Sequence, residues 1–120
     1  MVKKEDIEPQ LAQLMDSVPE VEGIAAVDRK KKKVIVAQTI TDMDQEEIAK
    51  NAIATVDNAS QLGGSIEKGN VTELSLKAVE GYCVLVATDE LILIVLTGED
   101  AASSVGLILR NLRIILDKLE

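Results

Sequence analysis

Aromatic side chains are almost absent from this 120-residue chain, which contains one tyrosine, Tyr82, and neither tryptophan nor phenylalanine. Proteins that bind single-stranded nucleic acid stack the bases on aromatic rings. The chain lacks such platforms, and its core must be built from aliphatic side chains. The scarcity of aromatics also disfavours a small-ligand pocket, because such pockets are lined mainly by apolar and aromatic residues.

Histidine is missing as well, and cysteine occurs once, at position 83. The absence of histidine excludes Ser-His-Asp and Cys-His catalysis and imidazole metal sites. A single cysteine forms no intrachain disulfide and no cysteine metal cluster. Because Cys83 lies in the apolar run 82–87, we interpret it as a small buried hydrophobe. We therefore expect no enzymatic activity, no catalytic or metal-binding residues and no cofactor.

Acidic residues outnumber basic ones by 21 to 13, which gives a formal net charge of −8. Proteins that bind the nucleic-acid backbone carry basic patches that release counterions, so we expect no nucleic-acid partner. The charged first residues, 1–6, do not resemble a signal peptide. No apolar run approaches the ~20 residues of a membrane span. The expected location is therefore the cytoplasm, without integral membrane contact.

One segment departs from this acidic balance. The run 29–33 holds five consecutive basic residues, while eight basic residues stand against 21 acidic ones elsewhere. It falls between two predicted strands and lacks the Asn-Gly or Asp-Gly pair of tight hairpins, so we expect a longer, mobile loop. The run is either a solvated turn or a docking site for an acidic partner or an anionic lipid surface. The candidate contact residues are Arg29, Lys31 and Lys32.

Hydrophobic periodicity predicts the order α-β-β-α-β-β-β-α in one domain that spans residues 1–120. The predicted helices cover about 5–17, 44–62 and 101–119, and the predicted strands cover 23–28, 33–40, 71–79, 82–87 and 91–96. Asp44 and Glu47 form a capping-box-like start to the second helix, and the pair Gly63 and Gly64 is predicted to end it. Its predicted buried face extends to Leu62. The last two strands are almost continuously apolar and should be covered on both faces.

Three further patterns predict surfaces. Beside the buried face of the second helix lie short side chains, which favour either a close helix contact or an ordinary solvated flank: Asn51, Ala54, Thr55 and Asn58. On the last helix, Leu107 and Ile114 lie one heptad apart, opposite the core stripe, as tolerated surface residues or as a partner contact. Gly106 in this helix predicts close packing on the sheet. The strand 71–79 alternates, with Leu74 and Leu76 on one face and the polar residues on the other.

The stretches VPEVEGIAAVD and EGYCVLVATDELILIVLTGEDAASSVGLILRNLRIIL, with this element order, resemble the Roadblock/LC7 family. The resemblance covers residues from about 7 to 119 and includes Gly23 in the first strand, Asp28 at the hairpin and Gly81 before two apolar strands. It implies an α+β sandwich of profilin- or longin-like type, with a five-stranded antiparallel sheet between helices. The lysine-rich hairpin tip departs from the family, in which many relatives carry a glycine turn.

Members of this family are non-enzymatic homodimers or heterodimers. They serve as dynein light chains, as scaffolds for small GTPases, or as regulators in bacterial and archaeal GTPase switches. Their dimers form through the second helix and the third strand, and pairing of that strand would remove its free edge. The resemblance implies an interface on both elements: Asn51, Ala54, Thr55, Asn58, Val71, Glu73, Ser75 and Lys77.

The resemblance therefore implies a non-catalytic scaffold that pairs with itself or with a paralogue and binds a small Ras-like GTPase, with regulation of that GTPase as a further role. One alternative is a structural, light-chain-like subunit of a larger assembly without a GTPase, which would use Leu107 and Ile114. Another is a small-ligand sensor, which the near absence of aromatics disfavours.

Overall fold

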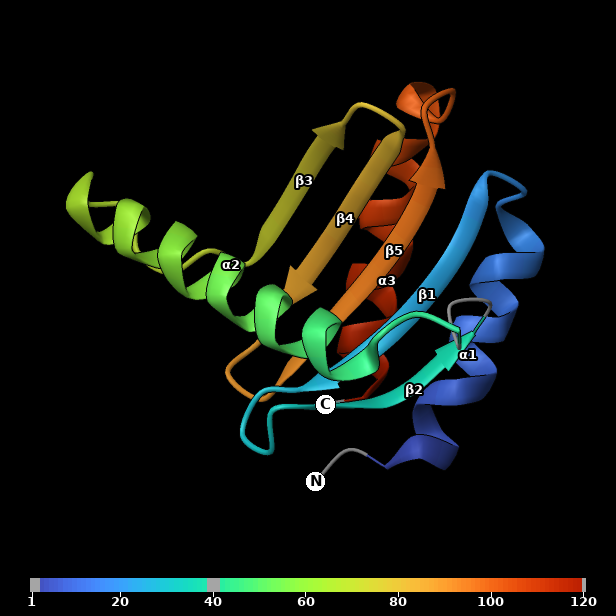
Figure 1. The fold of residues 1–120 in the computed structure, drawn as a ribbon, viewed down its shortest axis with the longest axis horizontal. Coiled ribbons are helices and arrows are strands. Elements are labelled where there is room, and N and C mark those ends of the chain that lie inside the picture. Colours follow the sequence, from blue (N-terminus) through green and yellow to red (C-terminus); the bar gives the residue numbers. More distant parts are fainter. Residues whose placement is uncertain (1–2, 39–41, 120) are drawn as a thin grey trace.

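The computed structural model describes residues 3–38 and 42–119 of the chain. The elements follow the predicted order (Figure 1): α1 (Lys4–Ser17), β1 (Val21–Asp28), β2 (Lys33–Gln38), α2 (Gln45–Ser65), β3 (Glu73–Ala78), β4 (Gly81–Ala87), β5 (Leu91–Gly98), a short 3-10 turn (Ala102–Ser104) and α3 (Val105–Leu119). The predicted fold class, α+β with a five-stranded antiparallel sheet, is confirmed.

The five strands form one antiparallel sheet in the order β2-β1-β5-β4-β3. β5 lies at the centre, paired with β1 and β4, and most of its side chains are buried. The second half of β4 is buried as well. The prediction that the last two strands are covered on both faces is therefore confirmed for most of β5 and for the second half of β4, whereas the first half of β4 is half-buried. β2 and β3 form the two edges of the sheet.

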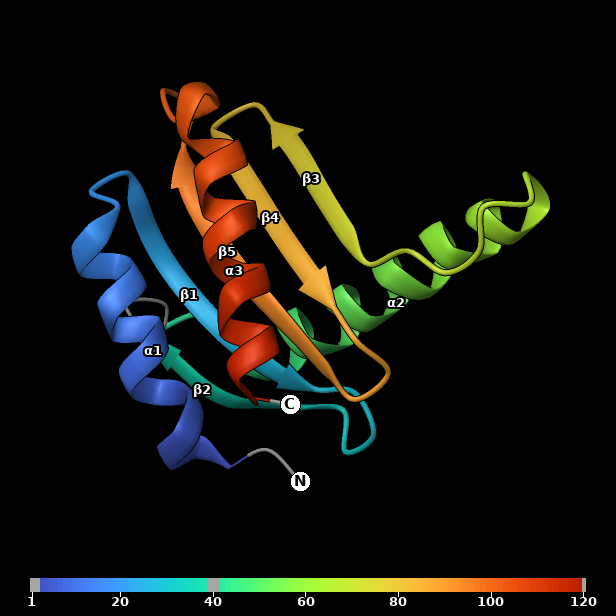
Figure 2. The same cartoon turned by 180° about the vertical axis from the view of Figure 1, so that it is seen from behind.

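Helices cover both faces of the sheet, but unequally. α1 and α3 lie side by side on one face and α2 lies on the other (Figures 1 and 2). Under α1 and α3, Ile7, Leu11, Ile108 and Leu112 pack on the sheet in the larger of two core clusters. The α2 layer is smaller and uses short helix side chains against the sheet: Ala49, Ala52 and Val56.

α2 is longer than the sheet is wide. Its 21 residues span about 31 Å at 1.5 Å per residue, whereas five strands about 4.8 Å apart span about 19 Å. The helix therefore crosses one end of the sheet and projects beyond β3 (Figures 1 and 2). The projecting part carries Leu62, which is 64% exposed. The prediction that Leu62 belongs to the buried face was wrong, because the helix has passed the edge of the sheet at that point.

The two ends of α2 are stabilised by different hydrogen bonds. At the start, the Asp44 side chain accepts a hydrogen bond from the backbone N–H of Glu47 at 3.1 Å, which confirms the predicted cap. At the other end, the helix continues to Ser65, one residue beyond the Gly63 and Gly64 pair that was predicted to end it. The carbonyl of Gly63 accepts hydrogen bonds from the N–H groups of Lys68 and Gly69 at 2.7 and 3.1 Å. Because Gly63 has no side chain, the segment at Lys68 and Gly69 can pack directly against the helix there.

The turn between β1 and β2 is short, in contrast to the longer loop predicted. Residues 29–32 connect the strands, and Lys32 adopts a left-handed φ of 58°. The Asp28 side chain accepts hydrogen bonds from the backbone N–H groups of Lys30 and Lys31 at 2.9 and 3.0 Å. The Asp28 side chain thus stabilises the turn by hydrogen bonds to its backbone, and the turn forms without a glycine. The last two residues of the predicted strand 33–40 lie outside the described residues.

Gly106 does not pack closely on the sheet. It is exposed, and a Cβ atom added to it would meet no neighbouring atom within 4 Å. The prediction of close packing there was wrong because Gly106 lies on the solvent side of α3.

Adjacent glycines near the end of α2 provide a test of this packing. A methyl group at Gly63 would collide with the carbonyl oxygen of Gly69, whereas one at Gly64 would meet no atom within 4 Å. Alanine is favoured over glycine inside a helix by about 1 kcal/mol. We expect Gly64→Ala to raise the free energy of unfolding by up to about 1 kcal/mol and Gly63→Ala to lower it by about 1–3 kcal/mol. Urea denaturation of both variants measures the difference, and equal effects would contradict the close approach at Gly63.

Candidate functional site

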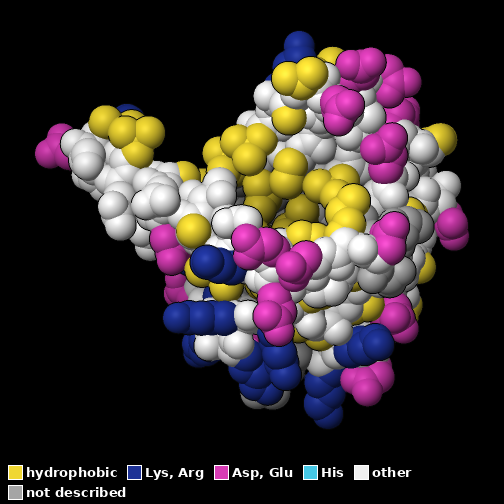
Figure 3. Space-filling model, viewed as in Figure 1, with side chains coloured by type: hydrophobic (Ala, Val, Ile, Leu, Met, Phe, Trp, Pro, Cys, Tyr) yellow, Lys and Arg dark blue, Asp and Glu magenta, His cyan; other side chains and the backbone are white. Residues whose placement is uncertain are grey.

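The part of the sheet that α2 leaves uncovered forms an open groove of about 450 Å³. One wall is the first half of α2, with Ile48, Ala52 and Thr55, and the floor is formed by β3, β4 and β5. Figure 3 shows hydrophobic side chains gathered in this hollow beside α2. The groove exists because the helix crosses only one end of the sheet.

The floor of the groove is aliphatic and regular. Strand pairing places two rows of side chains across it: Leu76, Cys83 and Leu96 in one row, and Leu74, Leu85 and Ile94 in the next. Leu76, on the edge strand, remains 41% exposed. Exposed apolar surface of this kind, bounded by polar residues, is typical of sites that contact another protein.

The four residues predicted on α2 lie together on one exposed side of the helix, next to the groove. Asn51 and Thr55 line its wall, and the Thr55 hydroxyl donates a hydrogen bond to the carbonyl of Asn51 at 2.7 Å. Ala54 and Asn58 are exposed. Their short side chains leave the backbone of α2 accessible, so a second helix could approach closely.

The residues predicted on the third strand are placed differently. Glu73 forms an ion pair with Arg113 of α3, so Glu73, Ser75 and Lys77 point to the α3 face rather than to the groove. Val71 precedes β3, which begins at Glu73 instead of 71, and its N–H donates to the Ser60 hydroxyl at 3.0 Å. The structure thus separates these side chains from the α2 stripe, although the edge of β3 adjoins the groove.

At the projecting end of α2, Leu62 was predicted to be buried, and Ile66, which directly follows the helix, was not singled out from the sequence. Leu62 and Ile66 are 64% and 57% exposed. They follow Thr55 at intervals of seven and four residues, which places all three on one side of the helix. The helical spacing was visible in the sequence. The missing information was where the sheet ends beneath the helix.

The basic hairpin tip is held firmly by Arg29. Its guanidinium donates hydrogen bonds to the Thr88 carbonyl at 2.6 Å and to the Asp57 carboxylate at 2.7 Å, which joins the tip to α2 and to the β4–β5 turn. Lys30 pairs with Glu90 at 3.1 Å. Of the predicted contact residues, Arg29 is therefore engaged within the chain, and its role as a partner contact stays a prediction.

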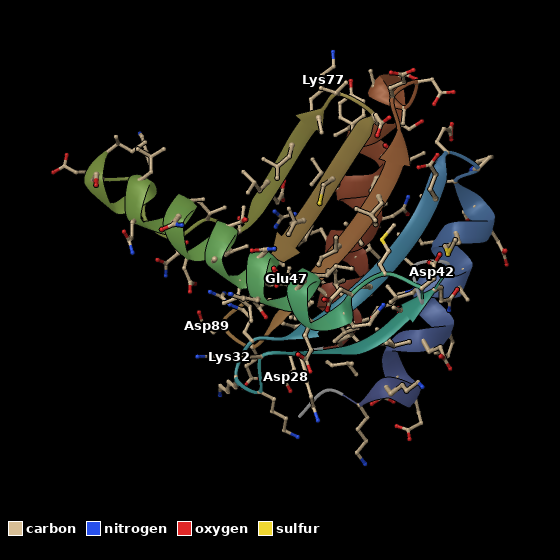
Figure 4. The ribbon with its side chains drawn as sticks, viewed as in Figure 1. Asp28, Lys32, Asp42, Glu47, Lys77 and Asp89 are labelled. Carbon is tan, nitrogen blue, oxygen red and sulfur yellow. The ribbon has the colours of Figure 1, made fainter. Side chains whose placement is uncertain are left out.

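Lys31 and Lys32 are exposed and form no ion pair among the described residues. Figure 4 shows Lys32 projecting away from the body at the end of the hairpin. The other predicted contacts, Leu107 and Ile114, are 51% and 42% exposed on α3. They lie on α3, on the opposite face of the sheet from the groove (Figure 2), so the predicted contacts form two separate surfaces, the hairpin tip and α3.

Within residues 3–38 and 42–119, no three histidine, cysteine, aspartate or glutamate side chains are grouped so that they could hold a metal ion. The helices in the same part of the chain are too short or too polar to cross a membrane. Cys83 is half-buried in the groove floor, and this burial raises the pKa of its thiol from 9.0 to about 11.

The sequence profile of the Roadblock/LC7 domain matches residues 9–97. The chain belongs to the Roadblock/LC7 family. This family is one of regulatory and adaptor domains, and the resemblance noted from the sequence is confirmed. A comparison with curated protein sequences gave no significant match.

Solved structures of this family share the fold. MglB from Myxococcus xanthus superposes with a TM-score of 0.81 at 13% identity, over 97% of this chain and 92% of that chain. The gliding protein MglB from Thermus thermophilus has a TM-score of 0.77 at 13% identity, with 99% and 93% covered. A Roadblock/LC7 domain from Streptomyces avermitilis has a TM-score of 0.61 at 24% identity, with 97% and 98% covered. At these identities the similarity shows the fold.

The raised pKa of Cys83 predicts slow thiol chemistry in the folded protein. The thiolate is the reactive form, and at pH 8 a pKa of about 11 leaves it on the order of 100-fold rarer than in the unfolded chain. We expect iodoacetamide to modify the folded protein at least that much more slowly than the urea-unfolded protein. The rate should keep rising up to about pH 11. Because the folded state favours the neutral thiol, this contribution to stability is present below pH 9 and is lost between pH 9 and 11. Equal rates in both states would contradict the burial.

Proposed function

We propose that the chain forms a homodimer in which β3 pairs antiparallel with β3 of a second copy. One observation carries this proposal: the chain has both an apolar groove beside α2 and an apolar helix end that projects beyond the sheet on the same face. Each feature exposes leucine or isoleucine side chains to water in the monomer. In the dimer, the projecting helix end of one copy would pack into the apolar groove of the other.

The symmetry of such a pair explains how the two features meet. Antiparallel pairing of identical strands places a two-fold axis perpendicular to the sheet, so both copies of α2 stay on the same face. The part of α2 that extends beyond β3 then lies above the sheet of the second copy. Leu62 and Ile66 would enter the groove floored by Leu76, Cys83 and Leu85. The side of α2 that carries Ala54 and Asn58 would face the second α2.

Two further considerations support self-association. The edge of β3 is unpaired in the monomer, and an unpaired edge strand invites pairing with another chain. A structure described as MglB with tetrameric arrangement has a TM-score of 0.77 to this chain at 12% identity, over 99% of this chain and 93% of that chain. By its description, that protein with this fold adopts a tetrameric arrangement.

We infer further that the dimer is a non-catalytic, cytoplasmic scaffold that binds a small Ras-like GTPase. Membership of the Roadblock/LC7 family supports this partner class, because the family includes scaffolds and regulators of small GTPases. The mechanism would be positional: a rigid, continuous sheet with two α2 helices on one face holds the partner's switch loops in one arrangement. Binding energy that differs between two states of those loops would shift their populations.

A structural, light-chain-like role is the second candidate. Leu107 and Ile114 on α3 favour it, since they are exposed on the layer that the proposed dimer leaves free. In that case, the contact with a larger assembly would be made through α3, and no nucleotide-dependent partner would be found.

The dimer interface is tested with charged substitutions on α2. Ala54→Arg places a long charged side chain in the helix contact, and Leu62→Asp places a carboxylate in the apolar groove of the second copy. We expect each to weaken dimerisation by about 100-fold or more, because unpaired charges in an interface cost several kcal/mol. Leu107→Asp is the matched control on the other layer and should remain dimeric. Light scattering coupled to gel filtration measures the mass, and dimeric Ala54→Arg and Leu62→Asp variants would disprove this interface.

The GTPase partner is tested by affinity capture on the purified protein, with a non-hydrolysable GTP analogue and again with GDP. We expect a small GTPase to be retained at least tenfold more in one nucleotide state. The Ala54→Arg variant should lose it if the dimer is the binding platform. Leu107→Asp serves as the control here as well. Retention of larger proteins alone, sensitive to Leu107→Asp and insensitive to nucleotide, would favour the light-chain role instead.

A further inference from the structure

A second cleft lies on the opposite side of α2 from the apolar groove, and it has a different character. It has a volume of about 570 Å³ and lies between the second half of α2, residues 70–72 and the β4–β5 turn. Its lining is largely polar and includes Arg29, Asp57, Gln61, Asn70, Thr72 and Asp89. Of its lining residues, only Val71 also belongs to the interface expected from the family resemblance.

The cleft is a built feature rather than a gap between mobile segments. Arg29 spans it from the hairpin, with hydrogen bonds to Thr88 and Asp57. The backbone N–H of Arg29 donates to the carbonyl of Glu90 at 2.9 Å. On the remaining side, the N–H of Val71 is held by the Ser60 hydroxyl. Four separate segments of the chain are thereby connected around one polar space.

Side chains in this cleft are available for hydrogen bonding. Among the described residues, the side chains of Gln61, Asn70 and Thr72 form no hydrogen bond within the chain, and all three residues are exposed. Amide and hydroxyl groups both donate and accept, so they match the alternating N–H and C=O groups of an extended peptide.

The charged residues that line the cleft itself are Arg29, Asp57 and Asp89, and the charge of the adjoining hairpin tip indicates which peptide would fit. Within the chain, Arg29 is paired with Asp57 and Lys30 with Glu90, and the Asp28 carboxylate faces the backbone of its own turn. Three lysines at the tip and two aspartates, Asp28 and Asp89, are left without an ion pair among the described residues. Figure 4 shows Lys32 and Asp89 on neighbouring loops on this side of the molecule. The unpaired charge is therefore positive, on an otherwise acidic protein.

The geometry points to a binding site for an extended acidic peptide segment of a partner protein. The peptide backbone would lie along Gln61, Asn70 and Thr72, and its carboxylates would face Lys31 and Lys32. Asp89 sets the register, since it repels a carboxylate placed next to it. A flat anionic membrane is the less suitable partner. In the proposed dimer the two hairpin tips lie at opposite ends of the sheet, so one plane could not engage both. The peptide site itself does not depend on the dimer.

The test uses a labelled eight-residue peptide of alternating aspartate and serine, with asparagine in place of aspartate as the control peptide. Fluorescence anisotropy at low salt measures affinity, and amide shifts in nuclear magnetic resonance spectra locate the site. We expect the aspartate peptide to bind at least tenfold more tightly than the control peptide. The largest shifts should fall in residues 29–33, 57–61, 70–72 and 87–89.

Matched variants separate the tip from the cleft. Lys31→Gln combined with Lys32→Asn removes two charges, with asparagine chosen because it tolerates the left-handed conformation. It should weaken binding about tenfold. Gln61→Trp fills the cleft without changing charge and should also weaken binding. The control, Lys4→Gln with Arg110→Gln, removes the same charge from the other face of the sheet and should bind as the unmodified protein does. So should Ala54→Arg, which tests the dimer separately.

Several results would overturn the proposal. These are no binding of the aspartate peptide, shifts located in the apolar groove, or equal weakening in the Lys4/Arg110 control. If Gln61→Trp had no effect, the cleft would be ruled out and binding assigned to the tip alone. Tip-dependent binding to phosphatidylserine vesicles, without binding of the peptide, would assign the tip to a lipid surface instead.

Discussion

The surfaces of this protein depend on one constraint: a helix of about 31 Å lies across a sheet about 19 Å wide. Only the first half of α2 can bury its apolar side against strands, through Ala49, Ala52 and Val56. The remainder projects beyond β3 with Leu62 exposed, and the far end of the sheet face is left open. The hydrophobic effect acts on both exposed parts at once. In the proposed dimer, a second copy related by a two-fold axis would cover both with a single contact.

The same helix divides its surroundings into two clefts of opposite character. On one side lie Leu76, Cys83 and Leu85 in an aliphatic floor, and on the other lie Arg29, Asp57 and the free amide side chains. Apolar area suits a permanent contact, since its burial is favourable and non-directional. A polar, charged surface suits a reversible and selective contact, since charge complementarity contributes mainly to specificity and to the association rate. The proposed function, a dimeric scaffold that binds a partner reversibly, would use both kinds of surface.

Sequence reasoning succeeded where the signal was local. The order of helices and strands, the Asp44 cap, the buried β5 and the exposure of Leu107 and Ile114 all followed from periodicity and capping. It failed where a residue's environment depended on distant segments. Leu62 has the spacing of a core residue but no sheet beneath it. Arg29 resembled a free surface charge, yet its partners are 28 and 59 residues away.

The sequence by itself determined the aliphatic core, the absence of histidine chemistry, the succession of elements and membership of the Roadblock/LC7 family. These depend on composition and on spacing along the chain, which can be read without coordinates. The tertiary structure decided which face of β3 borders the groove, where α2 leaves the sheet and which lysines of the hairpin tip remain unpaired. Each of these depends on the length and crossing position of one element relative to another. That relation arises only when segments distant in the chain are packed together.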